Sequence, residues 1–326
     1  IIEQASSTAT ARYKASLVKG KIFADLTGGA GVDTHAFTAR FERGICIDRD
    51  PKAAALLEHN LQLLSPKPIE VHTAAAEELI KDMPPADMIY IDPQRRNDQK
   101  KGLFRISDCA PNILALLPML QRKTDLVMLK TSPMLDITQA IKDLQHVREV
   151  HIVQWRGECK EVLYLIDFTN AASEDKAPHI VVDLDDEGAI SKRHQFTKSQ
   201  EETPAPLGLP EDYLYEPGPA FQKAGGFNSL AHEFEFRKLH KHTHLYTSKT
   251  LNTDFPGRHF KIINTLPINR KSLTFDKANL TIRNFPGDVA ALRKKLKLRE
   301  GGEDYLFACT LMDEQKILLH VRKENI

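Results

Sequence analysis

An acidic residue and three closely spaced glycines stand where the first strand of the chain should end. The stretch FADLTGGAGVDTHAF, residues 23–37, runs from apolar residues into Asp25 and then through Gly28, Gly29 and Gly31 before helical spacing begins. Glycines let a backbone approach a bound molecule closely, and the amino end of the following helix offers N–H groups to it. These residues therefore predict a ligand-binding turn.

The spacing of the glycines limits what the turn can hold. A dinucleotide-binding fold requires GxGxxG, whereas Asp33 stands here where the third glycine would be needed. A phosphate-binding loop requires GxxxxGK followed by serine or threonine, and this stretch has no lysine. The pattern that fits, with one substitution, is acid-x-(Gly)-x-Gly-x-Gly, supplied by Asp25, Thr27, Gly29 and Gly31.

This pattern resembles motif I of class I S-adenosylmethionine-dependent methyltransferases. The resemblance implies that S-adenosylmethionine is the cofactor, a molecule that has an amino-acid end and a sulfonium but no pyrophosphate. Asp25 would take the methionine ammonium, directly or through water. The backbone would approach the cofactor closely along the turn, which consists of Thr27, Gly28, Gly29, Ala30 and Gly31.

Two later positions are expected to complete the cofactor site. Asp48 ends the second strand 23 residues after Asp25, close to the spacing of about 20 for the ribose-binding acid of dinucleotide folds. We expect Asp48 to accept hydrogen bonds from both ribose hydroxyls and Asp50 to cap the next helix. The family usually has an acid beside the adenine after the third strand. This chain has Ala75 or Ala76 at that position and the acid Glu77 one or two residues later, with backbone and packing contacts as the alternative.

The candidate catalytic residues follow the fourth strand in IDPQRRND, residues 91–98. This stretch resembles the (Asp/Asn)-Pro-Pro-aromatic motif of amino-methyltransferases that act on nucleic acids. Asp92 and Pro93 match the motif, whereas Gln94 and Arg95 replace the second proline and the aromatic residue. The resemblance implies that Asp92 orients an acceptor amino nitrogen, and Arg95 would stack on a base or hold a phosphate.

A second resemblance leaves carbon methylation open. The DPxR sequence also resembles RNA uracil C5-methyltransferases, which need a cysteine nucleophile. Cys109 and Cys159 are the candidates, although an isolated cysteine near a strand is more often a small buried apolar residue. The loop at 94–102 adds Arg96 and two lysines beside the expected pocket, where they could hold phosphate.

The elements that must position these residues alternate between short β-branched runs and helical segments. This alternation predicts an α/β, Rossmann-like, mostly parallel sheet of seven strands followed by small α+β domains. The last two strands are separated by five residues only, so they should form an antiparallel hairpin with one reversed strand. The expected strands are 21–26, 44–48, 69–73, 87–92, 125–130, 148–155 and 161–168, and a further hairpin is expected at 179–196.

Three domains are expected along the chain. Residues 1–205 would form the methyltransferase domain with a trailing hairpin and linker. Residues 206–252 resemble a small ferredoxin-like domain, within which a helix is expected over 228–241. Residues 253–326 read as β-β-α-β-β and resemble the THUMP-like domain of a bacterial methyltransferase family. The methyltransferase part is loosely similar to RNA guanine N2 and trimethylguanosine synthase-type enzymes.

Charge is concentrated at one end of the chain. The whole sequence has a formal net charge of +1, but residues 255–326 contain 14 Lys and Arg against 8 Asp and Glu. The segment 292–300 carries five of these basic residues on an expected amphipathic helix, which is typical of a phosphate-binding surface. We therefore expect RNA, either tRNA or rRNA, as the partner. The candidate contacts are Arg96, Arg293, Lys294, Lys295 and Lys297, with Arg299 beside them.

Composition excludes several other classes. The four cysteines are far apart and form no CxxC pair, so we expect a reducing cytoplasm and no zinc ribbon. No apolar run reaches the roughly 18 residues of a membrane span. His240, His242 and His244 alternate, but they have no acid or cysteine nearby, so we expect surface histidines and no metal.

Three functions remain open at this stage. The favoured one is methylation of an RNA base, with an amino nitrogen as acceptor. The others are methylation of a small molecule or protein, and RNA binding without catalysis by a degenerate cofactor fold.

Overall fold

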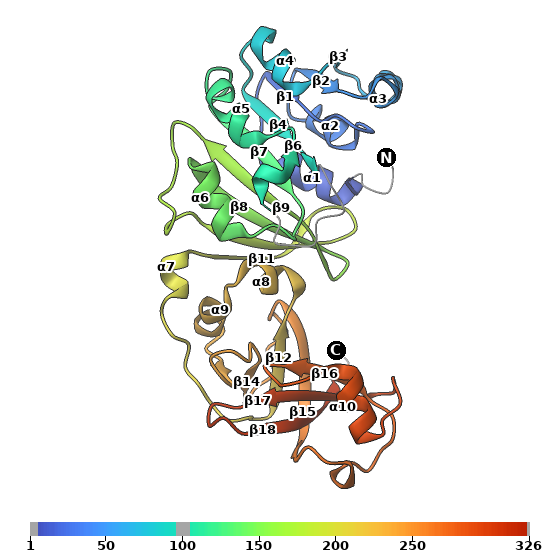
Figure 1. Cartoon of the computed structure of the whole chain (residues 1–326), viewed down its shortest axis with the longest axis vertical. Coiled ribbons are helices and arrows are strands. Elements are labelled where there is room, and N and C mark those ends of the chain that lie inside the picture. Colours follow the sequence, from blue (N-terminus) through green and yellow to red (C-terminus); the bar gives the residue numbers. More distant parts are fainter. Residues whose placement is uncertain (1–5, 96–104, 325–326) are drawn as a thin grey trace. The chain divides into compact units, whose positions relative to one another are not determined.

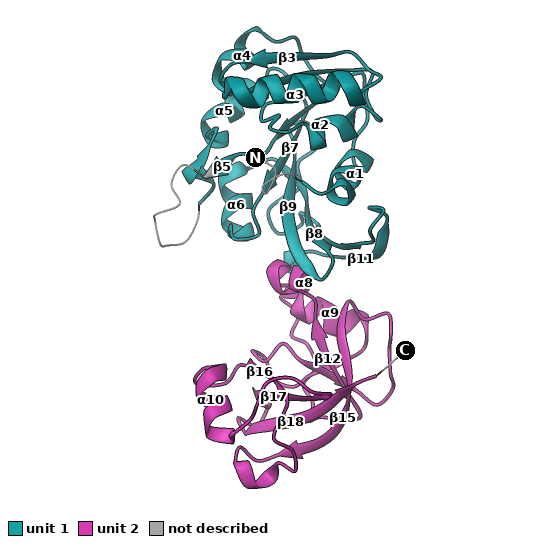
Figure 2. Ribbon diagram, turned by 90° about the vertical axis from the view of Figure 1, so that its right-hand side faces the viewer, with its two compact units in different colours: residues 1–199 teal, residues 200–326 magenta. Residues whose placement is uncertain are grey.

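The computed structural model describes residues 6–95 and 105–324, which belong to two compact units, 1–199 and 200–326 (Figure 2). Arg96 lies outside the described residues. In the first unit, a sheet has the strand order β11-β10-β8-β9-β7-β4-β1-β2-β3 (Figure 1). Its strands are β1 (Ile22–Asp25), β2 (Arg43–Asp48), β3 (Ile69–Thr73), β4 (Met88–Ile91), β7 (Leu126–Thr131), β8 (Val147–Trp155), β9 (Glu158–Asp167), β10 (His179–Leu184) and β11 (Ile190–Phe196).

The seven predicted strands are all present, but the prediction of seven in total is wrong because the sheet has nine. The hairpin predicted at 179–196 is not a separate element after the sheet, because its two strands, β10 and β11, extend the sheet. Its first strand pairs in parallel with β8, from His179 opposite Val150 to Leu184 opposite Trp155. The outer edge of β8 would otherwise leave its backbone groups unpaired, and β10 covers it. The reversed strand is confirmed as β9, which is antiparallel to both β7 and β8.

Helices cover both faces of this sheet (Figure 1). One group consists of α1 (Thr8–Ser16), α2 (Val32–Phe37) and α3 (Pro51–Leu64), and the other consists of α4 (Ala76–Asp82), α5 (Ile113–Leu120) and α6 (Ile137–Leu144). The predicted cap of α3 is confirmed, since the Asp50 carboxylate accepts a hydrogen bond from the backbone N–H of Lys52. Such a cap satisfies an N–H group that has no partner inside the helix.

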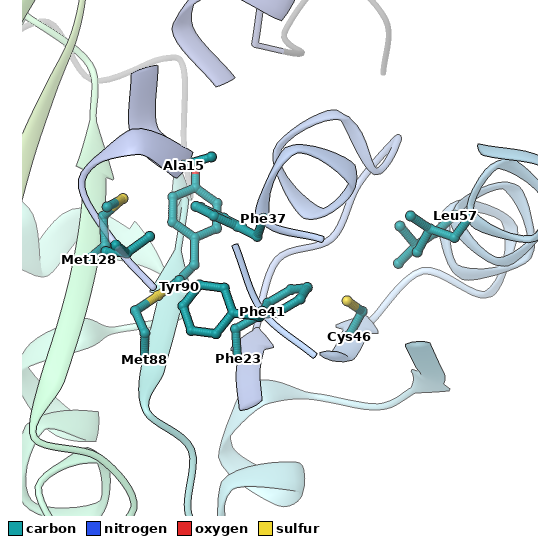
Figure 3. Packing of buried hydrophobic residues seen from close by; sticks show 11 residues of the cluster. Ala15, Phe23, Phe37, Phe41, Cys46, Leu57, Met88, Tyr90 and Met128 are labelled. Carbon is teal, nitrogen blue, oxygen red and sulfur yellow. The ribbon is translucent and has the colours of Figure 1, made fainter. Parts of the chain in front are cut away.

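Aromatic packing fixes the first helices against the sheet. The Phe23 ring on β1 lies 5.6 Å from Phe37 and 5.3 Å from Phe41, and Phe37 makes an edge contact with Tyr90 on β4 at 5.1 Å (Figure 3). All four side chains are almost fully buried. This core holds the carboxyl end of β1, and so the glycine turn, in a fixed position against α2.

The second unit contains a seven-stranded sheet with the order β13-β14-β12-β15-β18-β17-β16. The predicted β-β-α-β-β pattern is confirmed by β15 (Gly257–Leu266), β16 (Asn279–Arg283), α10 (Val289–Leu296), β17 (Asp304–Thr310) and β18 (Lys316–Lys323). The earlier part of this unit contributes β12 (Tyr213–Pro217), α8 (Pro219–Ala224), α9 (Phe227–Glu233), β13 (Arg237–Lys238) and β14 (Tyr246–Ser248). One sheet thus joins residues 206–252 to 253–326, and the domain boundary between them stays a prediction.

The helix expected over 228–241 is shorter than predicted and ends at Glu233. Glu235 has a left-handed φ of 55°, and the Phe236 N–H bonds to the carbonyl of Ala231. This turn directs Phe236 into an aromatic cluster, where its ring lies 4.2 Å from Tyr215. Burial of that ring outweighs the helical spacing of the sequence.

Candidate functional site

The glycine turn connects β1 to α2 in a conformation that side chains would disturb. Gly29 and Gly31 have left-handed φ angles of 54° and 85°, which glycine adopts without strain. A side chain at Gly28 would overlap Leu57, and a Cβ at Gly31 would lie 2.8 Å from the same residue. The Gly28 N–H donates to the Ile47 carbonyl at 2.8 Å, so the turn is tied to β2 as well.

Asp25 lies below the turn and is 1% exposed. One carboxylate oxygen accepts from the Thr27 N–H at 2.9 Å, and the other accepts from the Thr34 hydroxyl at 2.6 Å. Burial raises the pKa of Asp25 to about 7 against the opposing effect of these hydrogen bonds. Asp25 therefore organises the turn from beneath, with a proton that can leave near neutral pH.

Asp48 ties the end of β2 to the same turn. Its Oδ2 accepts from the Gly29 N–H at 3.0 Å, and its Oδ1 accepts from the Asp50 N–H at 2.9 Å. The side chain remains half-buried beside the turn. Ala76 is a buried residue of the first turn of α4, and Glu77 next to it is exposed. The cofactor contacts assigned to these residues stay predictions.

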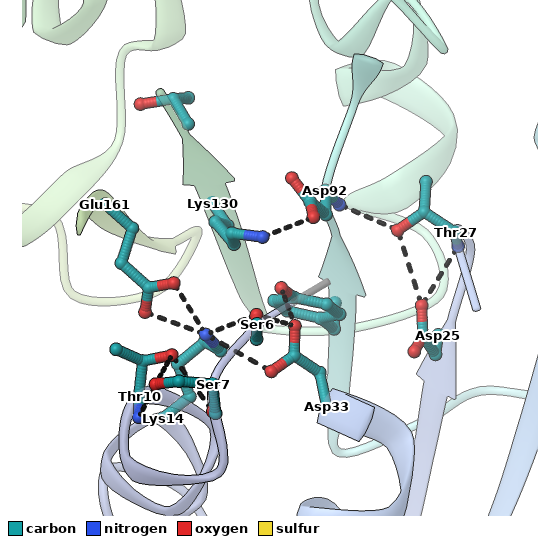
Figure 4. A network of polar contacts seen from close by, with 12 residues as sticks. Ser6, Ser7, Thr10, Lys14, Asp25, Thr27, Asp33, Asp92, Lys130 and Glu161 are labelled. Atoms are coloured by element: carbon teal, nitrogen blue, oxygen red, sulfur yellow. Dashed lines mark hydrogen bonds and ion pairs between the residues drawn. The ribbon is translucent and has the colours of Figure 1, made fainter. Parts of the chain in front are cut away.

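Asp92 follows β4 and pairs with Lys130 at the end of the neighbouring strand β7. The Lys130 ammonium donates to Asp92 Oδ2 at 2.5 Å, and the Asp92 N–H donates to the Thr27 hydroxyl at 2.7 Å (Figure 4). The side chains of Asp92 and Lys130 are 33% and 12% exposed. The predicted catalytic aspartate is thus connected directly to the predicted cofactor turn.

A second lysine completes a buried network beside this pair. Lys14 of α1 is fully buried and donates to both carboxylate oxygens of Glu161 on β9, at 2.7 and 2.8 Å (Figure 4). Its ammonium also lies 3.2 Å from Asp33 of α2. The other oxygen of Asp33 accepts from the hydroxyls of Tyr90 and Ser6 at 2.7 and 2.8 Å. The elements α1, α2, β4 and β9 therefore meet at one charged cluster.

Burial and charge set the protonation of this network. Burial raises the pKa of Asp92 even though Lys130 opposes the shift. Burial lowers the pKa of Lys130, but the surrounding carboxylates, Asp92 first, outweigh it and hold that pKa above its ordinary value. The carboxylates around Lys130 therefore favour its charged form.

The residues around the turn fit a cationic ligand. Four carboxyl groups, those of Asp25, Asp33, Asp92 and Glu161, lie together with only two ammonium groups among the described residues of this cluster. S-adenosylmethionine has a sulfonium, an ammonium and one carboxylate, so its net charge opposes that of the cluster. When bound, it supplies an electrophilic methyl group. The chain would hold it through the glycine turn and Asp48.

Gln94 and Arg95 form the short strand β5, which pairs with β6 (Cys109–Ala110). Their expected place in a loop is therefore wrong, because a two-residue ladder extends the chain there. Beside it is a pocket of about 70 Å³, smaller than the roughly 300–1,000 Å³ of most ligand sites. Its lining residues are Pro93, Arg105, Asp108, Cys109, Ser132, Met134 and Leu135. Cys159 lies apart on β9 and is half-buried.

The basic residues around α10 differ in how far they are engaged. Arg293 donates to the Ala278 carbonyl at 3.2 Å, and Arg299 pairs with Asp276 at 2.6 Å. Lys294, Lys295 and Lys297 are exposed. These three lysines therefore form the more available part of the predicted RNA surface, which we call the α10 lysine patch.

Of the three alternating histidines, His242 is exposed as the sequence predicts, whereas His240 is buried and His244 is half-buried. His240 is 5% exposed and contacts Glu314 at 3.2 Å and the Asn284 amide at 3.0 Å. His244 stacks on Phe227 with ring centroids 3.6 Å apart. Within residues 6–95 and 105–324, no three His, Cys, Asp or Glu side chains gather as a metal site would require. In the same part of the chain, no helix has the length and apolar character to span a membrane.

The sequence prediction missed four participants in the site, namely Lys14, Asp33, Lys130 and Glu161. A signal for Lys130 exists, because it ends the predicted strand 125–130 just as Asp92 ends the predicted strand 87–92, and neighbouring parallel strands end at the same edge. Lys14 and Glu161 carry no such signal. Their contact depends on how α1 docks and on the antiparallel direction of β9.

The fold and site together define a class I S-adenosylmethionine-dependent methyltransferase. The structure aligns with a solved structure from Porphyromonas gingivalis W83, described as a methyltransferase, with a TM-score of 0.90 and 32% sequence identity. The alignment covers 99% of this chain and 82% of that one. The chain belongs to the same family as the Porphyromonas protein, among the S-adenosylmethionine-dependent methyltransferases.

Other comparisons cover parts of the chain. Residues 213–256 match a ferredoxin-like domain model, and residues 257–323 match a THUMP domain-like model. Two Mycobacterium tuberculosis proteins, described as uncharacterized S-adenosylmethionine-dependent methyltransferases, are 24% identical over 160 residues. That match spans 49% of this chain and 42% of each relative, so less than half of their length is represented.

We predict that Asp48→Ala weakens S-adenosylmethionine binding by roughly 10- to 100-fold. The substitution removes a carboxylate that holds the Gly29 N–H, and a charged hydrogen bond contributes about 1.5–3 kcal/mol. Titration calorimetry measures the change. Asp50→Ala is the matched control, because it removes only the cap of α3 and should cost about 1 kcal/mol of stability with nearly unchanged affinity. Wild-type affinity in Asp48→Ala would contradict the assignment.

Asp25→Asn should change how stability depends on pH. The carboxyl titrates near 3.8 when unfolded and near 7 when folded, so the folded protein binds the extra proton between these values. The unfolding free energy of the wild type should therefore fall, relative to the variant, by up to about 1.4 kcal/mol per pH unit as pH rises across that range. Urea unfolding at several pH values measures it. Parallel curves for the two proteins would show that Asp25 is not protonated in the folded state.

Proposed function

We propose that this protein transfers a methyl group from S-adenosylmethionine to RNA. The observation that carries the proposal is the direct connection between the cofactor turn and Asp92, through the hydrogen bond from the Asp92 N–H to Thr27. A carboxylate at this position lies where an acceptor would meet the cofactor. Scattered cysteines, all four outside disulfide bonds, fit a reducing cytoplasm as the place of action.

Within this proposal the residues divide into two sets. Asp25 and the turn from Thr27 to Gly31 shape the cofactor site, and Asp48 takes the ribose, with Ala76 and Glu77 near the adenine. Asp92 orients the acceptor, and Pro93, Gln94 and Arg95 border it. The sequence prediction of a base amino nitrogen as acceptor stays a prediction.

RNA as the substrate class is supported by the second unit. The match to a THUMP domain-like model covers most of residues 253–326, and the same region has the surplus of basic residues. The α10 lysine patch, Lys294, Lys295 and Lys297, extends charged side chains into solvent, as phosphate contacts require.

The proposal is tested with methyl-labelled S-adenosylmethionine and total RNA from a host strain that lacks this gene. Wild-type protein should transfer label to RNA, and Asp92→Asn should lose at least about 100-fold in turnover at saturating cofactor, a larger loss than the weaker cofactor binding caused by removing one negative charge. Asn keeps the shape of the side chain and removes its charge. If wild-type protein labels no RNA, or if Asp92→Asn labels it equally well, the proposal fails.

The α10 lysine patch should control the salt dependence of RNA binding. Each phosphate contact to a single strand contributes about 0.7 to the slope of log affinity against log salt. The double variant Lys294→Glu with Lys295→Glu should lower that slope by the contribution of about one or two phosphate contacts. Its affinity for the cofactor should be unchanged. The control is Lys67→Glu with Lys81→Glu, the same change of charge at exposed lysines of the first unit. Equal slopes for both double variants would show that the α10 lysine patch does not bind RNA.

A further inference from the structure

We propose that the acceptor is a hydroxyl group, the ribose 2′-hydroxyl of RNA, and that Lys130 is the catalytic residue that contacts its oxygen. The inference rests on the proposed function for RNA as the substrate. It replaces the base amino nitrogen that the sequence motif predicts. The juxtaposition that carries it is an ammonium and a carboxylate together at the carboxyl ends of β7 and β4, beside the cofactor turn.

The position of Lys130 is built into the fold. Its ammonium lies 2.5 Å from Asp92 Oδ2, and Asp92 is in turn tied to Thr27 of the turn. Lys130 is 12% exposed and Asp92 33%, so the pair borders solvent rather than lying in the core. An acceptor that reaches Asp92 therefore also meets Lys130 (Figure 4).

The neighbouring ion pair joins Lys14 to Glu161, so Asp92 is the carboxylate to which Lys130 donates its hydrogen bond. Both oxygens of Glu161 are taken by Lys14, at 2.7 and 2.8 Å. Glu161 therefore has its own cation, and Lys130 has its hydrogen bond to Asp92 at the strand ends. The arrangement fixes an ammonium at the acceptor position instead of drawing it into the interior.

A nitrogen acceptor and an oxygen acceptor develop charge of different sign during methyl transfer. An amino nitrogen gains positive charge as it attacks the methyl carbon, so an ammonium beside it raises the barrier. A hydroxyl oxygen must lose its proton, and an ammonium stabilises the negative charge that develops on it. Lys130 therefore favours oxygen over nitrogen.

The surroundings of Asp92 point the same way. In the amino-methyltransferase motif an aromatic residue stacks on the target base, and here Gln94 and Arg95 take the corresponding positions in β5. Among the described residues that line the pocket beside Pro93, no aromatic side chain forms a stacking slot for a nucleobase. A ribose hydroxyl needs no such slot, and the 2′-hydroxyl is the aliphatic hydroxyl that each internal RNA nucleotide presents.

The transfer balances with the residues present. The hydroxyl oxygen forms a C–O bond to the methyl carbon as the C–S bond of the sulfonium breaks, and that electron pair stays on sulfur. The hydroxyl proton passes to the Asp92 carboxylate, which burial makes a stronger base than an ordinary aspartate. Lys130 remains protonated. Its ammonium donates a hydrogen bond to the hydroxyl oxygen while negative charge develops on that oxygen.

The decisive experiment is nucleoside analysis of RNA labelled by the wild-type protein from methyl-labelled S-adenosylmethionine, using RNA from the host strain that lacks this gene. Label in 2′-O-methyl nucleosides, within dinucleotides that resist alkaline hydrolysis, supports the inference. Label on a base overturns it and leaves the proposed function standing. An RNA fraction without label overturns both.

Lys130→Met tests the assigned residue by a second readout. Turnover should fall by at least about 100-fold, the effect of removing one donor to a developing oxyanion. Calorimetric affinity for S-adenosylmethionine should be equal or tighter, since one positive charge is removed near a cationic ligand. Lys142→Met on α6 is the control, a lysine with a half-exposed side chain in the same unit. Full turnover in Lys130→Met, or weakened cofactor binding that accounts for the loss, would overturn the role of Lys130.

Discussion

The ion pairs of Lys14 hold the methyltransferase unit together at its functional edge. A fully buried ammonium is stable only where carboxylates replace water around it, and Lys14 has Glu161 on β9 and Asp33 on α2. Removing one member of such a buried pair costs about 3–5 kcal/mol, because the remaining charges lose their partner. The docking of α1 and the charge state of the site therefore depend on the same contact.

The consequences of this contact reach the cofactor turn. Asp33 belongs to the helix that follows the turn, and Tyr90, which donates to Asp33, belongs to the strand that leads to Asp92. Aromatic packing of Phe23 and Phe37 fixes the same elements from below. A rigid base of this kind lets Lys130 and Asp92 keep a defined position without a ligand to hold them.

The sequence predicts the parts of this site that follow local rules. Strand ends, glycine spacing and the cap at Asp50 depend on residues close together in the chain, and each predicted strand is present. The charged network depends on contacts between residues as far apart as Lys14 and Glu161, for which no local pattern exists. The sheet has nine strands rather than seven for a related reason, since the edge that β10 covers arises only after β8 and β9 have paired.

We infer that excess negative charge around the turn recognises the cationic cofactor, and the proton balance of binding tests this inference most directly. Titration calorimetry in buffers of different ionisation enthalpy measures the protons exchanged when S-adenosylmethionine binds. Since the pKa of Asp25 is about 7, an arriving positive charge should expel part of a proton at neutral pH. Binding without proton exchange, or with proton uptake, would contradict the account.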